Sequence, residues 1–242
     1  MSKRGQDIVA LLAQADLLLL LGRLFSPPTA EPRAEIEAAW PSFAELVRQA
    51  GVGHEETLNE AFVAARREAR GLDTGAWAGE YNRLFECAVS CPINESGFVR
   101  RDKGAILGDI AGFYRAFGLT LAGDATERVD HLVCELEFFA MLLVMLAKAR
   151  EEKNKDGAEV SEKALSAFAD DHLGVWLPTF SDRLMLTTGL PFYLQAAVLL
   201  REAWQGIVEY HGLPCPTEAA GARVGADPGT PYECGLAEAG LT

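Results

Sequence analysis

The stretch DHLVCELEFFAMLLVMLA, residues 130–147, constrains the fold more than any other part of the chain. Its last ten residues are all apolar, and a helix that is apolar all round must be surrounded by protein or lipid. Ten apolar residues are too few to cross a bilayer, which takes about 20. The inward positions recur at the three- and four-residue steps of one helical face: Leu132, Leu136, Phe139, Leu143 and Leu146. We therefore expect a buried central helix with a polar first turn at the protein surface.

The remaining periodic segments also have helical spacing, and no stretch alternates as a strand does. Prolines and glycines separate the expected helices at 6–25, 32–50, 54–70, 77–85, 102–117, 160–172, 175–188 and 191–210. Residues 87–101 form the longest internal loop, and such loops are often functional. The sequence predicts an all-α, single compact multi-helix domain over residues 1–212. Residues 213–242 are rich in Gly, Pro and Ala, and we expect a disordered tail there.

Composition excludes several classes of protein. The chain has 22 Lys and Arg against 35 Asp and Glu, a net charge of −13, which repels nucleic-acid phosphates. Five cysteines in no regular framework fit a reducing compartment. The N-terminus superficially resembles a signal peptide, but Asp7, Gln14 and Asp16 interrupt its leucines at helical spacing. We predict a cytoplasmic protein that binds no nucleic acid and has no stable membrane insertion.

Side chains that could support catalysis are few. His131 and Glu135 are four residues apart and would share a helical face, as metal ligands often do. Cys87 and Cys91 could form half of a metal site, with Cys134 as a further thiol. No phosphate-binding glycine loop or nucleophile motif accompanies them. A helical metal- or nucleotide-dependent enzyme remains the alternative function, and reduced thiols with a helix-capping Asp130 remain the structural alternative.

Three ordered segments indicate a family. The first is EYNRLF at residues 80–85, followed by the loop from Pro92 to Ser96. The second is DHL at 130–132 with ELEF at 135–138, and the third runs from Phe168 through DHL at 171–173 to Phe180. In this order they resemble the TorD/DmsD/NarJ-like chaperones that mature molybdenum enzymes. Residues 108–118, GDIAGFYRAFG, resemble the subgroup that serves type II enzymes of the dimethyl sulfoxide reductase family.

The resemblance implies a non-catalytic helper that binds the apo catalytic subunit of a molybdenum oxidoreductase, in many cases through its twin-arginine leader, until cofactor is inserted. It implies no stably bound cofactor, because the client carries the bis-molybdopterin guanine dinucleotide. The loop matches the family at Pro92 and Ser96 but departs from it at residues 93–95. The positions that the resemblance assigns to client or leader binding are Asp130, His131, Tyr81, His172, Trp176, Pro92 and Ser96. To these we add Glu135 as a second carboxylate.

The chemistry of a twin-arginine leader fits this assignment. A leader joins two arginines to an apolar segment, so its receptor needs carboxylates beside an apolar groove. Asp130 and Glu135 could supply the carboxylates for bidentate pairing, with Phe138 and Phe139 as the apolar neighbours. The sequence leaves open whether the protein is a monomer or a dimer, and whether it stays in the final complex as a structural subunit.

Overall fold

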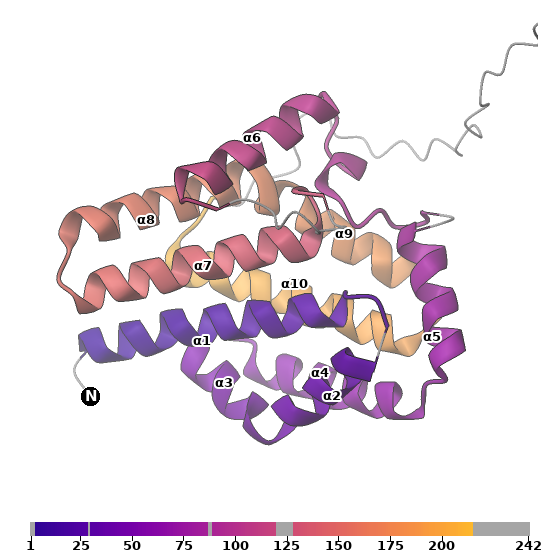
Figure 1. Ribbon diagram of the computed structural model, residues 1–242. Helices are drawn as coiled ribbons and strands as arrows, with labels where there is room; N and C mark the ends of the chain where they lie inside the picture. Colours follow the sequence, from indigo (N-terminus) through magenta and orange to yellow (C-terminus); the bar gives the residue numbers. More distant parts are fainter. Residues whose placement is uncertain (1–2, 29, 87–88, 120–127, 215–242) are drawn as a thin grey trace, which may run out of the picture.

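The computed structural model describes residues 3–28, 30–86, 89–119 and 128–214. Within these ranges the regular elements are all helices, which confirms the all-α prediction (Figure 1). Cys87 and the predicted tail from residue 215 onward lie outside the described residues. No helix of the described part is both long and apolar enough to span a membrane.

The predicted central helix is α7 (Leu132–Glu151), which lies between α1 (Lys3–Leu24) and α8 (Lys155–Phe168) (Figure 1). Its five predicted inward residues have no exposed surface. Val144 and Met145 are 42% and 38% exposed. The second half of α7 is therefore not covered all round as expected, because α1 and α8 cover its flanks and leave an outer edge open.

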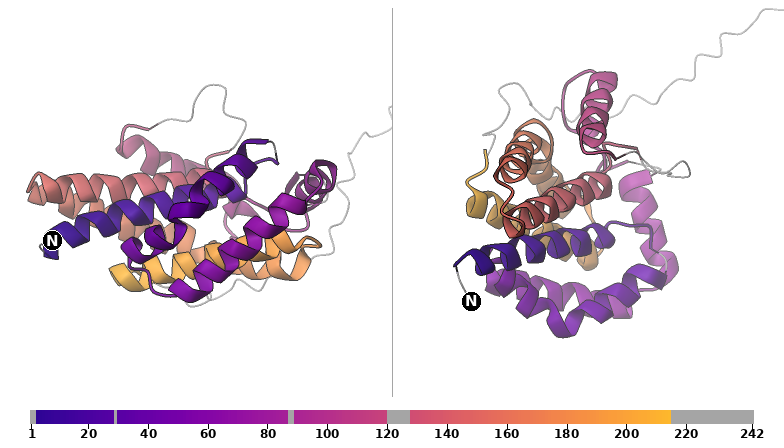
Figure 2. Two further views of the ribbon diagram at one scale, coloured as in Figure 1. Left: turned by 90° about the horizontal axis from the view of Figure 1, so that it is seen from below. Right: turned by 60° about the vertical axis from the view of Figure 1, so that its left-hand side comes forward.

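The helices of residues 30–71 lie on the side of α1 opposite α7 (Figure 2). The helix predicted over residues 32–50 is divided at Pro41: α2 (Ala30–Ala39) passes through the short turn Trp40–Ser42 into α3 (Phe43–Ala50). The chain continues through α4 (Glu55–Gly71) and α5 (Thr74–Tyr81). The last helix, α10 (Pro191–His211), packs against α4, α9 (Gly174–Thr187) and α1.

Close backbone approach fixes the position of α10. A Cβ at Gly206 would lie 2.0 Å from the Val52 carbonyl oxygen, so only glycine allows this contact. On the opposite side of the bundle, α6 (Lys103–Ala116) begins at the side-chain cap of Asp102 and packs Phe113 against Phe168. These contacts place the loop between α5 and α6 over the start of α7.

Candidate functional site

The loop between α5 and α6 is fastened to the start of α7. Asn94 and His131 form an isolated antiparallel β-bridge. The Glu95 amide donates a hydrogen bond to the Asp130 carbonyl at 2.9 Å, and the Leu132 amide donates back to the loop at 3.0 Å. These backbone bonds join the predicted loop motif to the predicted helix-start motif.

The loop holds its shape through a tight internal contact. A Cβ at Gly97 would lie 2.4 Å from the Cβ of Pro92, a separation that a side chain cannot adopt. Glu95–Gly97 forms a short 3-10 turn, and Ser96 in this turn is half-buried. Pro92 and Ser96 therefore shape the loop that faces α7.

Asp130 is fully buried and binds four groups from this region. Arg128 donates to it in a fork, from Nε to Oδ1 at 2.9 Å and from Nη2 to Oδ2 at 2.6 Å. The Ser96 amide adds a bond at 3.2 Å, and Nδ2 of Asn94 adds one at 3.3 Å. Burial alone would raise the pKa of Asp130, but the hydrogen bonds from Arg128 and Ser96 outweigh it and lower the pKa. Asp130 is therefore an ionised carboxylate.

His131, rather than Asp130, caps α7. Its extended backbone precedes the helix, and its Nδ1 accepts a hydrogen bond from the Val133 amide at 3.2 Å. A neutral imidazole that accepts at Nδ1 carries its proton on Nε2. The ring is only 7% exposed.

A cleft of about 360 Å³ opens beside this helix start. Its lining comes from segments that are distant in sequence: the end of α1, the α5 region, the loop and the start of α7. The apolar lining residues are Pro27, Tyr81, Phe85 and Ile93. The polar lining residues are Glu86, Asn94, Arg128 and His131. The cleft therefore offers apolar surface and hydrogen-bonding groups side by side.

The first motif is held in place by its own charged residues. Glu80 pairs with Arg83 at 2.7 Å and accepts the Gly189 amide at 2.6 Å. Arg83 also donates to the Thr187 carbonyl at 2.7 Å. These bonds tie the end of α5 to the turn between α9 and α10, and so fix Tyr81 at the cleft.

A buried polar cluster lies behind the loop. Oε2 of Glu95 is 2.9 Å from Nδ1 of His172, and Nε1 of Trp176 donates to Oε2 of Glu135 at 3.1 Å. All four side chains have no exposed surface. Oε1 of both glutamates and Nε2 of the histidine have no hydrogen-bond partner among the described residues. Nε2 of His172 lies 4.0 Å from the carboxylate of Asp109, which is 48% exposed.

The neutral and ionised forms of the Glu135 carboxyl group differ in free energy. Burial raises its pKa well above the ordinary value, and the nearby charge of Glu95 raises it further. The hydrogen bond from Trp176 acts in the opposite direction and is the weaker influence. Glu135 is therefore favoured as a neutral carboxylic acid, in contrast to the ionised Asp130.

Two π-helical turns lie inside the sequence motifs. Asn82–Glu86 continues α5 within the first motif, and Ala169–Leu173 joins α8 to α9 within the third. Such turns are rare and frequently occur at functional sites. The second turn carries His172 into the buried cluster.

The sequence matches the family described as nitrate reductase delta subunit over residues 30–182. This match covers more than half of the chain. The chain belongs to this family.

Curated relatives carry names that agree with the resemblance to TorD/NarJ-like chaperones. The selenate reductase assembly chaperone protein of Thauera selenatis is 32% identical over 159 residues, which are 56% of this chain and 81% of that protein. The chlorate reductase assembly chaperone protein of Ideonella dechloratans is 39% identical over 112 residues, 45% and 57% of the two chains. Chaperone protein TorD of Vibrio parahaemolyticus is 30% identical over 112 residues, 46% and 49%. The match spans about half the length of these last two relatives.

These family members are named as chaperones rather than enzymes, in agreement with the predicted non-catalytic function. The enzyme alternative gains no support from the geometry. His131 and Glu135 do not form a joint site, since one caps the helix and the other is buried against Trp176. Across residues 3–28, 30–86, 89–119 and 128–214, no group of three His, Cys, Asp or Glu could hold a metal. Cys91 is buried, with Sγ 3.8 Å from the Phe180 carbonyl.

The structure divides the predicted site residues into two groups. Tyr81 and His131 meet at the cleft, and the loop with Pro92 and Ser96 forms one edge of it. The members of the second group are fully buried: Asp130, Glu135, His172 and Trp176. The expected surface position of the polar first turn of α7 was therefore wrong, because the loop folds over it and supplies its hydrogen-bond partners.

Sequence reasoning missed three residues of this region. Glu95 stands in the part of the loop that departs from the family pattern, and only the fold brings it to His172. Arg128 is a basic residue two positions before Asp130, a spacing that carries no specific prediction by itself. Glu86 follows the first motif, is exposed at the cleft and has no ion pair with a described residue.

Proposed function

We propose that this protein is a system-specific cytoplasmic chaperone that binds the apo catalytic subunit of a molybdenum oxidoreductase. It assists insertion of the molybdenum cofactor and assembly before export, and it binds no cofactor stably itself. Family membership and the relatives named for assembly of selenate and chlorate reductases support this function.

We further propose that the client's twin-arginine leader binds the cleft between Tyr81 and His131. The single observation that carries this proposal is that two predicted binding residues from separate motifs converge on one cleft with an apolar and a polar side. The apolar lining suits the apolar segment of a leader. The exposed carboxylate of Glu86 suits a leader arginine, because guanidinium and carboxylate pair through two parallel hydrogen bonds.

The volume of the cleft limits what it holds. A cleft of about 360 Å³ lies at the low end for small-molecule sites. It therefore accommodates only a few leader residues, and the folding catalytic subunit would contact other surfaces of the chaperone.

Long-range electrostatics support the same partner. The net charge of −13 creates a negative potential that attracts a basic peptide and raises its association rate at low ionic strength. The association rate of the leader should therefore fall as salt is added, since exposed charges are screened over about 10 Å at 0.1 M salt.

The first experiment is capture of partners by the tagged full chain in its own host, grown by anaerobic respiration. The expected partner is a molybdenum catalytic subunit that lacks cofactor or retains its leader, identified by mass spectrometry. A folded bait that captures no such subunit while an apo client accumulates in the same cells would refute the chaperone proposal. Pterin and molybdenum analysis of the bait alone tests the absence of stable cofactor.

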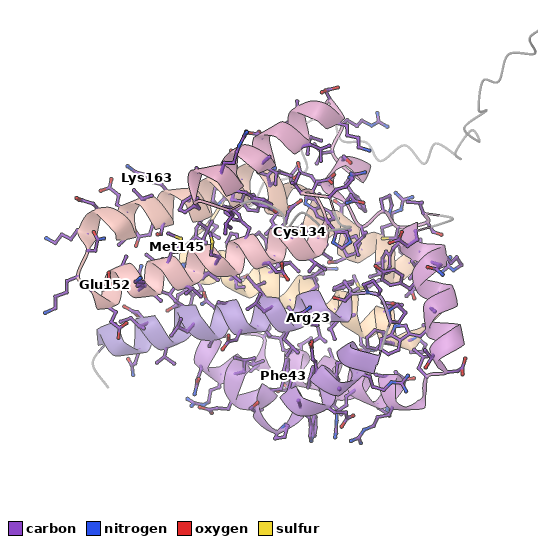
Figure 3. All side chains as sticks on the ribbon, in the orientation of Figure 1. Arg23, Phe43, Cys134, Met145, Glu152 and Lys163 are labelled. Carbon is purple, nitrogen blue, oxygen red and sulfur yellow. The ribbon has the colours of Figure 1, made fainter. Side chains whose placement is uncertain are left out.

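The second experiment tests whether the leader binds in the cleft. Binding of a fluorescent peptide with the client's leader sequence is measured by anisotropy for wild type, Glu86→Gln and Glu152→Gln. Glu152 is exposed at the opposite end of α7 from the cleft, as Figure 3 shows by its label and that of Cys134. We expect Glu86→Gln to weaken binding by up to about fivefold, as loss of an exposed ion pair does. Equal affinities of all three proteins would remove Glu86 from the site.

A further inference from the structure

Arg128 stands between the cleft and the buried carboxylate of Asp130. The guanidinium lines the cleft and is 40% exposed, while the Asp130 side chain has no exposed surface. The two side chains form a fork–fork pair, and Nη2 of Arg128 also donates to the Ser96 hydroxyl at 2.8 Å. The chain therefore satisfies its own ionised carboxylate with an arginine that reaches solvent.

Loss of the pair would cost Asp130 more free energy than it would cost Arg128. Asp130 is buried, and a buried carboxylate without a cation is costly. The guanidinium of Arg128 is 40% exposed, and it regains water when it leaves. Exchange of Arg128 for another arginine would keep the fork of charge-assisted bonds on Asp130 intact. A lysine could not reproduce that planar fork.

Among the described acids of this region, Asp130 is the one that can exchange its arginine partner for an arginine of the client. Glu135 is favoured in its neutral form by burial and by Glu95, and Glu95 is committed to His172. Both lie in the buried cluster, and their side chains bond to His172 and Trp176, whereas the Asp130 carboxylate bonds to Arg128 and Asn94, which line the cleft. Glu86 is exposed at the cleft, where water already solvates its carboxylate.

We propose that Arg128 is a built-in occupant of an arginine site formed by Asp130, Ser96 and Asn94, and that an arginine of the client leader displaces it. This inference rests on the proposed binding of the leader in the cleft and adds the exchange with Arg128 by which an arginine of the leader reaches Asp130. The intramolecular pair acts as an autoinhibitory contact. Arg128 competes at the high effective concentration of a tethered group, so a leader stays bound only while its other contacts outweigh this competition.

The test compares leader binding by wild type and Arg128→Ala, with a peptide that has two arginines and one in which both are lysine. Removal of the competitor should tighten binding of the arginine peptide by at least about tenfold, the value of a hydrogen bond to a charged group. The lysine peptide should gain far less. The double variant Arg128→Ala/Asp130→Asn should bind the arginine peptide without this increase in affinity. Arg201→Ala, which breaks the exposed pair with Asp182, is the matched control and should leave affinity unchanged.

The outcomes separate this inference from the proposed function. If wild type binds the leader and folded Arg128→Ala binds it no more tightly, the exchange is refuted and the leader site stands. If neither protein binds the leader, the proposed leader site fails and the exchange fails with it, while the capture experiment still decides the chaperone function.

A second measurement does not require the client, and it tests the inference even if Arg128→Ala is too unstable for the peptide assay. Ethylguanidinium at millimolar concentration should raise the melting temperature of Arg128→Ala more than that of wild type, by filling the vacated site. Ethylammonium should have a smaller effect, and Arg128→Ala/Asp130→Asn should show no specific rise. Equal responses of all three proteins to ethylguanidinium would overturn the arginine site at Asp130.

Discussion

Oε2 of Glu95 lies 2.9 Å from Nδ1 of His172, although the two residues are 77 positions apart and neither has exposed surface. This contact connects the loop above α7 with the π-helical turn between α8 and α9. A loop that forms one edge of the cleft is thereby anchored in the interior, and its geometry depends on a buried polar pair.

The costs of changing Glu95 and His172 should not be additive. His172→Ala leaves Glu95 buried without its hydrogen-bond partner, and we expect a loss of about 1–3 kcal/mol in the free energy of unfolding. Glu95→Gln/His172→Ala should lose less than the sum of the single changes. Urea denaturation of wild type, Glu95→Gln, His172→Ala and the double variant gives the coupling free energy between the two residues. The exposed pair Arg201 and Asp182 is the control cycle, with an expected coupling below about 1 kcal/mol. Additive costs at Glu95 and His172 would contradict the pairing.

Stability should depend on pH through Glu135. Its pKa is raised in the folded state, so the stability it contributes is fully present below its ordinary pKa of 4.5 and is lost as pH rises through the folded-state value. Glu135→Gln keeps an oxygen acceptor for Trp176 and has no charge at any pH. The variant should therefore be increasingly more stable than wild type as pH rises above 4.5. Parallel pH–stability curves for the two proteins would contradict the raised pKa, and the exposed Glu137→Gln on the same helix serves as control.

The contact between Gly97 and Pro92 predicts a sharp difference between two glycines. Gly97→Ala places a methyl group 2.4 Å from the Pro92 Cβ, and we expect a loss of about 1–3 kcal/mol, as for overpacking in a core. Gly108→Ala lies inside α6 with no atom within 4 Å of the new Cβ, and it should be neutral or stabilise by up to about 1 kcal/mol. Thermal melts of both variants check this, and leader affinity should fall only for Gly97→Ala.

Cys91 should resist alkylation in the folded protein. Burial raises the pKa of its thiol to about 12, so almost no thiolate forms at pH 8. We expect iodoacetamide to modify the half-buried Cys134 first and Cys91 only after urea is added. Peptide mapping by mass spectrometry distinguishes the two sites. Fast modification of Cys91 without denaturant would show that the loop opens readily.

Local patterns in the sequence predicted the parts of the fold that local interactions determine. The five inward residues of α7 follow helical spacing and have no exposed surface, and Asp102 caps α6 at the predicted boundary. The break at Pro41 likewise follows from proline chemistry. In these cases the residues that fix the structure are neighbours in sequence.

The environment of Asp130 could not be predicted in this way. Its partners Ser96 and Asn94 lie more than 30 positions earlier in the chain, and no periodicity reports a contact between a loop and a helix start. The same holds for Glu135, whose polar side chain at the start of a helix suggested exposure until Trp176 was placed beside it. The resemblance to the family pointed to residues that the fold brings together around one loop and one helix start, and only the fold shows which of them line the cleft.

The π-helical turn Ala169–Leu173 also sets how the chain tolerates changes in length. Deletion of one residue there would let the helix continue with α geometry and would rotate everything that follows by about 100°. Trp176 would leave Glu135, and Phe180 would leave the core. The charged turn at residues 152–154 connects α7 and α8 at the surface and could absorb a deletion by local rearrangement. The helix face that each later residue occupies is therefore set within a helix, at the turn that carries His172.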